Sequence, residues 1–280
     1  MMFGKSAKIH PLSIVQNARI MVATELEESK VNNSVQLNLR KLCEVEETWL
    51  SSMVSQNIQI ITDVVFDESL KKVVEHEKHI FNELLIYQEI RDTSNHEQAS
   101  AILTAAILKG NIDFKKWNEE IEHFIRRANF ASRNAPHYDI PEVDDEARFF
   151  IIQQSIYKCR STKDIEKCTI WPTLKAWYTY EQLSAIDYLA PVSVELMHKK
   201  HSVKLRYDEK GEAILSETVQ ALYDCPPVML CEGKVQVVYE ILAPSRRPVQ
   251  ITRDLEQFWK NSYFDVKKDL KGRYPKHEWR

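Results

Sequence analysis

Residues 252–272, TRDLEQFWKNSYFDVKKDLKG, carry the clearest local pattern in the chain. Thr252 is a natural N-cap, and acidic residues follow it in the first turn, where they face the positive end of the helix dipole. Lysines fill the last turns, and Gly272 can end a helix in the left-handed conformation. The pattern predicts an amphipathic helix with one apolar stripe, formed by Leu255, Phe258, Trp259, Ser262, Val266 and Leu270.

Upstream of this helix, the pattern alternates between helical and extended. Residues 95–190 combine capping residues with apolar positions three or four apart, which predicts several helices, one of them beginning at Asp113. Residues 191–243 contain short apolar runs, and residues 208–211 have the composition of a hairpin turn. We therefore expect mixed strands between the helical region and the final helix.

The N-terminal part is mostly extended in pattern. Its candidate strands are residues 18–23, 34–39, 58–66, 72–78 and 80–90. The last of these also fits a helix, and residues 44–54 have helical spacing. Five strands with one inserted helix are typical of a small barrel of the oligonucleotide-binding (OB) type, either closed or half-closed.

These patterns together predict an α+β fold. It would contain an OB-like small β-barrel, a central helical region, and C-terminal mixed strands followed by the amphipathic helix. A chain of 280 residues is long enough for two domains. We expect an OB-like β domain over residues 1–92 and a helical plus α/β domain over residues 93–280.

The charge is distributed unevenly along the chain. The formal net charge is −3, but residues 244–280 hold ten Lys or Arg against five Asp or Glu. The tail is therefore a basic block on an acidic body. Such a block indicates a nucleic acid, an acidic partner protein, or the acidic body of the same chain as its binding partner.

The composition excludes several classes of enzyme. Five glycines are too few and too scattered for a phosphate-binding loop, and Gly4-Lys5-Ser6 lacks the earlier glycine and the strand of a Walker A motif. Residues 145–148, DEAR, share letters with a Walker B box but are better explained as charges at a helix N-terminus. We expect no ATPase activity, and no enzyme activity, from this chain alone.

Metal and nucleophile motifs are also missing. The five cysteines form no C-x-x-C pair, and no nucleophile elbow occurs. His76 and His79 would lie on opposite faces of a strand, whereas His198 and His201 flank two lysines that repel a cation. We expect no catalytic residue, no metal site and no cofactor in this chain. Sparse cysteines and the absence of a long apolar segment favour a cytoplasmic protein without a membrane partner.

Cations and aromatic residues alternate in the basic tail, and a second group of cations precedes it. Lys and Arg neutralise phosphates and aromatic rings stack on bases, so this composition favours nucleic-acid binding. The same residues could instead pair with the acidic body or with the end of the helix. The candidate nucleic-acid-binding residues are Arg246, Arg247, Arg253, Lys260, Lys267, Lys268, Lys271, Arg273, Tyr274, Lys276, Lys199, Lys200, Lys204 and Arg206.

The tail also carries a family likeness. Residues 242–255, LAPSRRPVQITRDL, together with Phe258-Trp259, Ser262-Tyr263 and residues 272–277, GRYPKH, resemble the C-terminal signature of the HrpB family. This family consists of bacterial ATP-dependent RNA helicases of the DEAH/RHA type. Weaker likeness extends upstream over most of the chain. The two motor domains, which in this family hold ATP and Mg²⁺, match no part of the chain.

The resemblance implies an accessory, non-motor module of an RNA helicase. Such a module would guide single-stranded RNA or another nucleic acid, or dock onto the motor domains of the same protein. The alternative is a protein-interaction scaffold that does not bind nucleic acid directly. In that case the basic tail would satisfy the acidic body or a partner protein.

Overall fold

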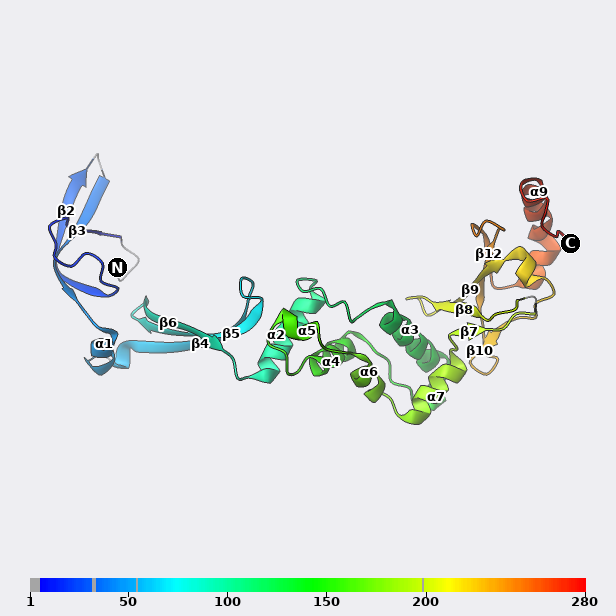
Figure 1. Ribbon diagram of the computed structural model, residues 1–280, viewed down its shortest axis with the longest axis horizontal. Helices are drawn as coiled ribbons and strands as arrows, with labels where there is room; N and C mark the ends of the chain where they lie inside the picture. Colours follow the sequence, from blue (N-terminus) through cyan, green and yellow to red (C-terminus); the bar gives the residue numbers. More distant parts are fainter. Residues whose placement is uncertain (1–5, 32–33, 54, 198) are drawn as a thin grey trace. The chain divides into compact units, whose positions relative to one another are not determined.

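The strands that the structure describes in this α+β chain form four separate sheets (Figure 1). The computed structural model describes residues 6–31, 34–53, 55–197 and 199–280. Its residues group into two units. The N-terminal unit contains residues up to 112 together with residues 157–165, and the C-terminal unit contains residues 113–156 and 166–280.

Two three-stranded sheets belong to the N-terminal unit. In the first, the order is β1-β3-β2, with β2 and β3 antiparallel and β1 parallel to β3. In the second, β4, β5 and β6 form an antiparallel meander. The elements are β1 (Lys8–Ile9), β2 (Met21–Val31), β3 (Ser34–Glu44), α1 (Glu47–Met53), η2 (Ser55–Asn57), β4 (Ile58–Asp67), β5 (Lys72–Phe81), β6 (Leu84–Asp92), α2 (His96–Leu108) and α5 (Thr162–Ile165).

The predicted OB-like barrel is not observed. Among the described residues, no ladder joins the two sheets, and neither sheet closes on itself. A barrel requires every edge strand to find a neighbour, but α1 and η2 separate β3 from β4, which then pairs with β5 alone. The ambiguous segment 80–90 is extended, and a turn at Asn82 and Glu83, both with positive φ, divides it between β5 and β6.

Residues distant in sequence complete the N-terminal unit. Val73 and Val74 of β5 are buried, as is Leu103 of α2, which packs on β4 and β5. The Val73 amide donates to the carbonyl of Arg160 at 2.7 Å, so residues 157–165 are tied to the start of β5. The compact units thus differ from the predicted domains, 1–92 and 93–280, in where they place α2 and residues 157–165.

Helices form the first part of the C-terminal unit, as the spacing predicted. Side chains cap the starts of α3 and α4: Asn118 accepts from the amides of Glu120 and Ile121, and Asp144 accepts from the amide of Ala147. The predicted start at Asp113 is wrong, since Asn118 is the cap. The DEAR segment begins a helix, as expected. The elements are α3 (Glu119–Asn134), η3 (Pro136–Tyr138), α4 (Asp145–Ser155), α6 (Trp171–Ala176) and α7 (Tyr180–Leu189).

A five-stranded sheet in the order β13-β12-β9-β8-β7 forms the second part of the C-terminal unit. The strands β9 and β12 are parallel, and the other neighbouring strands of this sheet are antiparallel. Gly211, with φ of +79°, lies in the predicted hairpin turn between β8 and β9. The elements are β7 (Ser193–Val194), β8 (Val203–Tyr207), β9 (Ala213–Thr218), η4 (Val219–Leu222), β10 (Met229–Leu230), β11 (Val235–Gln236), β12 (Val238–Leu242) and β13 (Pro248–Thr252).

Aromatic residues with satisfied hydroxyls lie at the centre of this unit. Tyr207 and Tyr239 are fully buried, as is Phe130 of α3, whose ring contacts that of Tyr207. Burying a hydroxyl is costly unless it is hydrogen-bonded. The Tyr207 hydroxyl donates to the carbonyl of Pro191 at 2.8 Å, and the Tyr239 hydroxyl accepts from the amide of Val228 at 2.7 Å. The sheet is therefore joined to the helices and to the segment before β10.

The final helix is interrupted by one wide turn. It consists of α8 (Leu255–Gln257), a π-helical turn η5 (Phe258–Ser262) and α9 (Tyr263–Arg273). Asp254 is the N-cap rather than Thr252, and Gly272 lies inside α9 instead of ending it. The π turn adds a residue to one turn, so the apolar stripe continues at Tyr263 and not at Ser262. Its buried members are Leu255, Phe258, Tyr263 and Leu270.

Across the ranges given above, no helix is both long enough and apolar enough to cross a lipid bilayer.

Replacing Asn118 with Ala should lower the free energy of unfolding of the C-terminal unit by about 1 kcal/mol, because two amides at the start of α3 lose their acceptor. Urea unfolding followed by circular dichroism measures this. Asn261→Ala is the matched control, since Asn261 belongs to the same unit, is exposed and makes no side-chain hydrogen bond among the described residues. Equal midpoints for the two variants would contradict the capping role.

Candidate nucleic-acid interface

Two of the candidate cations are bound to one buried carboxylate. Glu217, near the end of β9, is only 4% exposed. Lys199, from the loop before β8, lies 2.8 Å from its Oε1, and Arg246, from the turn between β12 and β13, lies 3.1 Å from the same atom. The amide of Thr218 donates to Oε2 at 2.7 Å. Lys199 and Arg246 therefore compensate a buried charge and join three segments of the unit.

The electrostatics of Glu217 agree with this structural role. Burial raises the pKa of its carboxyl, but the hydrogen bonds from Lys199 and from the Thr218 amide, with the charge of Arg246, more than reverse that effect. The pKa lies below its ordinary value, and the group is ionised at neutral pH.

Four more candidate cations have partners within the chain. Arg253 pairs with Glu212, Lys260 with Glu256, and Arg273 with Asp269. The Lys267 ammonium donates to the main-chain oxygen of Arg280 at 2.6 Å. The first three pairs are exposed, so each adds little to stability, but each places a carboxylate beside its cation.

The other candidate cations are exposed and form no ion pair with any residue that the structure describes. They belong to α9 and the segment after it, to the turn before β13, and to β8 and the loop before it. These unpaired cations are Lys268, Lys271, Lys276, Arg247, Lys200, Lys204 and Arg206.

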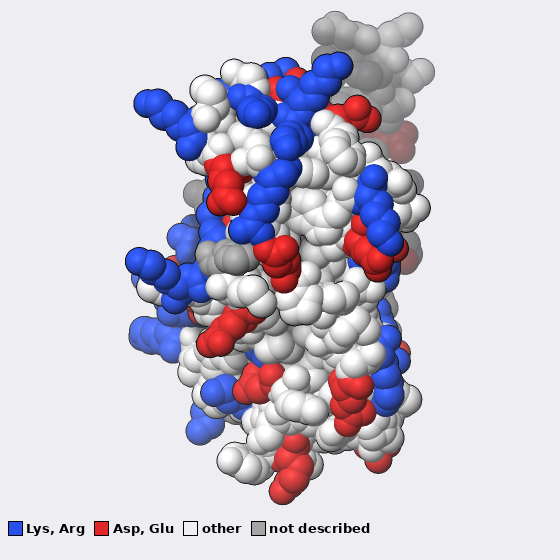
Figure 2. All heavy atoms as spheres, turned by 90° about the vertical axis from the view of Figure 1, so that its right-hand side faces the viewer, with Lys and Arg blue, Asp and Glu red and all other residues white. Residues whose placement is uncertain are grey.

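One face of α9 combines two of these cations with an exposed aromatic ring. Phe264, Lys268 and Lys271 are separated by four and three residues, so they lie on the same side of the helix. Phe264 is 67% exposed, although it is a large apolar residue. We call these three residues the α9 stripe. Figure 2 shows one face of the C-terminal unit, where Lys and Arg side chains gather in the upper part with acidic side chains among them.

A second pair of unpaired cations lies on β8. Lys204 and Arg206 are exposed on one face of the strand, while Leu205 and Tyr207 are buried on the other. Lys204 is opposite Ser193 of β7, and Arg206 is opposite Ile214 of β9. Alternate residues of a strand are about 7 Å apart, close to the spacing of phosphates along an extended strand.

The candidate aromatic residue Tyr274 is half-buried, and its ring contacts His277 edge-on. Its carbonyl accepts from the indole of Trp279 at 3.0 Å. Tyr274 therefore helps to fold the end of the chain. Phe264, which sequence reasoning missed, is the more exposed ring. The exposure of Phe264 depends on how the π turn changes the direction in which the later residues of the helix face.

Two of the weaker sequence motifs fall partly outside the described residues: Gly4 and Lys5 of the Gly-Lys-Ser run, and His198 of the second histidine pair. His76 and His79 lie on β5, three residues apart, and so on opposite faces as predicted. In the described part of the chain, no three metal-ligating side chains come together.

Comparison with known proteins points to one family. Residues 151–280 match a family model described as ATP-dependent helicase C-terminal. The ATP-dependent RNA helicase HrpB of Escherichia coli (strain K12) is 29% identical over 197 residues, which make up 69% of this chain and 24% of that protein. Residues 151–280 are therefore similar to the C-terminal region of HrpB. The chain spans about a quarter of the length of this curated relative.

Solved structures of HrpB share the fold. The crystal structure of the E. coli DExH-box NTPase HrpB has a TM-score of 0.60 at 24% identity, over 93% of this chain and 32% of that one. The crystal structure of the Escherichia coli DEAH/RHA helicase HrpB has a TM-score of 0.55 at 22% identity, over 98% and 34%. The likeness predicted from the tail motifs is thus confirmed, and the HrpB-like fold extends beyond them.

Glu217→Gln should lower the free energy of unfolding at pH 7 by about 2 kcal/mol, because Lys199 and Arg246 lose a charged acceptor. The folded-state pKa of Glu217 is depressed, so this stability is complete above its ordinary value of 4.5 and is lost as the pH falls below it. Unfolding curves for both proteins between pH 3 and pH 7 should therefore converge at the acid end.

Glu256→Gln is the control for this prediction. Glu256 and Lys260 are both exposed, so their ion pair adds little to the free energy of unfolding. A gap between wild type and Glu217→Gln that does not change with pH would show that the ionised carboxylate is not what stabilises the cluster.

Proposed function

We propose that this chain is a C-terminal accessory module of an ATP-dependent RNA helicase, and that its C-terminal unit contacts a single nucleic-acid strand. The observation that carries the proposal is the α9 stripe, in which an exposed phenylalanine ring is followed along one side of the helix by two exposed lysines that form no ion pair with any described residue. Cations that follow the phosphates and a ring that stacks on a base are the two elements of sequence-tolerant strand binding. The likeness to HrpB, an RNA helicase, supports RNA as the strand.

The division of labour follows from the family likeness. ATP hydrolysis and Mg²⁺ binding would belong to motor domains, onto which this module would dock, and this chain would contribute no catalytic residue. The module would act in the cytoplasm and hold or guide the strand that the motor moves. Of the sequence-predicted cations, Lys199 and Arg246 are the least available for this role, since Glu217 binds both.

A protein-interaction scaffold is the second candidate function. It is favoured by β13, which is an edge strand of the five-stranded sheet, and by Ile251 on that strand, which is 66% exposed. An exposed edge with an apolar side chain suits pairing with a strand of another protein. Binding that needs Ile251 and is insensitive to salt would favour this candidate over the strand-binding module.

The first test is the affinity for labelled single-stranded RNA at several salt concentrations between about 50 and 200 mM. Lys268→Ala with Lys271→Ala should weaken binding and reduce the slope of log K against log salt by about 1.4, because each phosphate contact contributes roughly 0.7 for a single strand. Fluorescence anisotropy provides both quantities.

The matched control is Lys260→Ala with Arg273→Ala, which removes two cations from the same helical segment that are already paired. It should leave the slope nearly unchanged. Equal slopes for the two double variants, or no binding even at about 50 mM salt, would refute strand binding through the α9 stripe.

Phe264→Ala should weaken RNA binding by about tenfold without changing the salt slope, since it removes a stacking surface and no charge. Tyr188→Ala is the control, because Tyr188 on α7 is also 67% exposed. If both variants bind as tightly as wild type while the lysine variant does not, Phe264 is not a stacking platform.

A further inference from the structure

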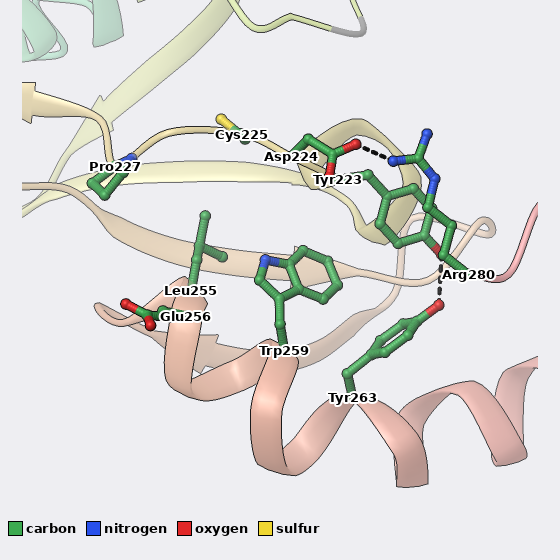
Figure 3. A pocket seen from close by; sticks show the side chains of 9 residues that line it. All are labelled: Tyr223, Asp224, Cys225, Pro227, Leu255, Glu256, Trp259, Tyr263 and Arg280. Carbon is green, nitrogen blue, oxygen red and sulfur yellow. Dashed lines mark hydrogen bonds and ion pairs between the residues drawn. The ribbon is translucent and has the colours of Figure 1, made fainter.

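A cavity of about 540 Å³ lies where the start of the final helix faces the segment that follows η4 (Figure 3). Its walls include Tyr223, Trp259 and Tyr263, and its charged members are Asp224, Glu256 and Arg280. The volume is within the range of roughly 300–1,000 Å³ that is common for small-ligand sites. None of the sequence motifs, and no residue of the α9 stripe, gives this cavity a function.

The aromatic side of the cavity is rigid. The Trp259 ring lies 5.5 Å from that of Tyr223, 5.1 Å from that of Tyr263 and 4.7 Å from that of Phe258, measured between centroids. The hydroxyls of Tyr223 and Tyr263 are hydrogen-bonded at 2.7 Å. In Figure 3, Trp259 rises from the helix between Leu255 and Tyr263 and borders the open space. The indole of Trp259, packed against the other rings, is the flat surface that suits a flat ligand.

The charges in the cavity argue against a cationic ligand. An aromatic cage for a cation gains from the faces of its rings and from a nearby unpaired carboxylate. Here Asp224 is paired with Arg280, and Glu256 is paired with Lys260. The Arg280 guanidinium also lies 4.8 Å from the centroid of the Tyr223 ring. The carboxylates of the cavity and the Tyr223 ring are therefore already occupied by cations of the chain itself. The remaining space suits an uncharged planar group.

One polar group of the cavity has no partner among the residues that the structure describes. The Trp259 indole N–H makes no hydrogen bond there, although Trp117 and Trp279 both donate theirs. The N–H lies in the plane of the ring, so it remains able to donate to an oxygen beside a group that covers the ring. In a nucleic-acid strand, ribose and phosphate oxygens lie beside each base.

We infer that this cavity binds one unstacked base of the RNA strand, with the base lying against Trp259 and a ribose or phosphate oxygen accepting from its indole N–H. The inference rests on the proposed strand binding and names the element that holds a base. Trp259 and Phe264 are five residues apart on the same helical segment. The inference requires one strand to reach both the α9 stripe and the cavity.

The direct test follows the indole N–H signal of Trp259 by NMR, assigned by its loss in Trp259→Phe. Uridine and adenosine 5′-monophosphates should shift the signal, and ribose 5-phosphate, which lacks a base, should not. An equal shift with ribose 5-phosphate would overturn the inference. So would a shift caused by tetramethylammonium but not by the nucleotides, because it would indicate a cation cage.

The second test measures RNA binding. Trp259→Leu should weaken it about tenfold at an unchanged salt slope, whereas Trp259→Phe, which keeps an aromatic face, should lose little. Circular dichroism checks that both variants fold, and the Phe variant remains informative if the Leu variant does not. Salt-sensitive RNA binding that is equal in wild type and both variants would overturn the cavity inference and leave the proposed function intact. If wild type binds no RNA at all, the proposed function and the inference built on it both fail.

Discussion

The C-terminal unit is organised around one ionised carboxylate that is withdrawn from water. A buried charge is stable only with compensating partners, and Glu217 has them from two other segments, the loop that holds Lys199 and the turn that holds Arg246. In that turn the backbone of Arg246 itself has a positive φ of 66°. Arg247, the next residue, is left exposed. Both arginines are exposed, but Arg246 is paired with a buried carboxylate, whereas Arg247 forms no ion pair with any described residue.

A basic composition is not the same as a basic surface, because some of the cations are already paired with anions of the chain. Counting Lys and Arg in the tail identifies cations but does not show which of them already have anions. The structure leaves Lys268 and Lys271 unpaired while Lys260 and Arg273, on the same helical segment, are paired. The surface that can attract an external polyanion is therefore smaller than the sequence indicates, and it contains an aromatic ring, Phe264, that charge counting does not find.

Features with a local cause were predictable, and features that depend on partners were not. Helical spacing and the turn at Gly211 follow from nearby residues, and the helices and the turn were found, although α3 begins at Glu119 rather than Asp113 and the final helix is capped by Asp254 rather than Thr252. The predicted barrel was not found. The alternation of apolar and polar residues determines which face of a strand a residue occupies, but it does not determine which strand lies beside it. The ion pairs of Glu217 join residues 199, 217 and 246, and no local pattern encodes a contact at that separation. The tail likeness succeeded because it compares a long, specific string of residues.

The π turn over Phe258–Ser262 sets the rotational phase of everything after it. Each residue of a regular helix turns the chain by about 100°. The π turn takes up one extra residue, so regular α-helical geometry at the same chain length would rotate α9 by about 100° and turn Lys268 and Leu270 away from the directions they now face. The spacing between Trp259 and Tyr263 is thus as constrained as their identities. Straightening this stretch without removing a residue would act like a simultaneous substitution of every side chain on α9.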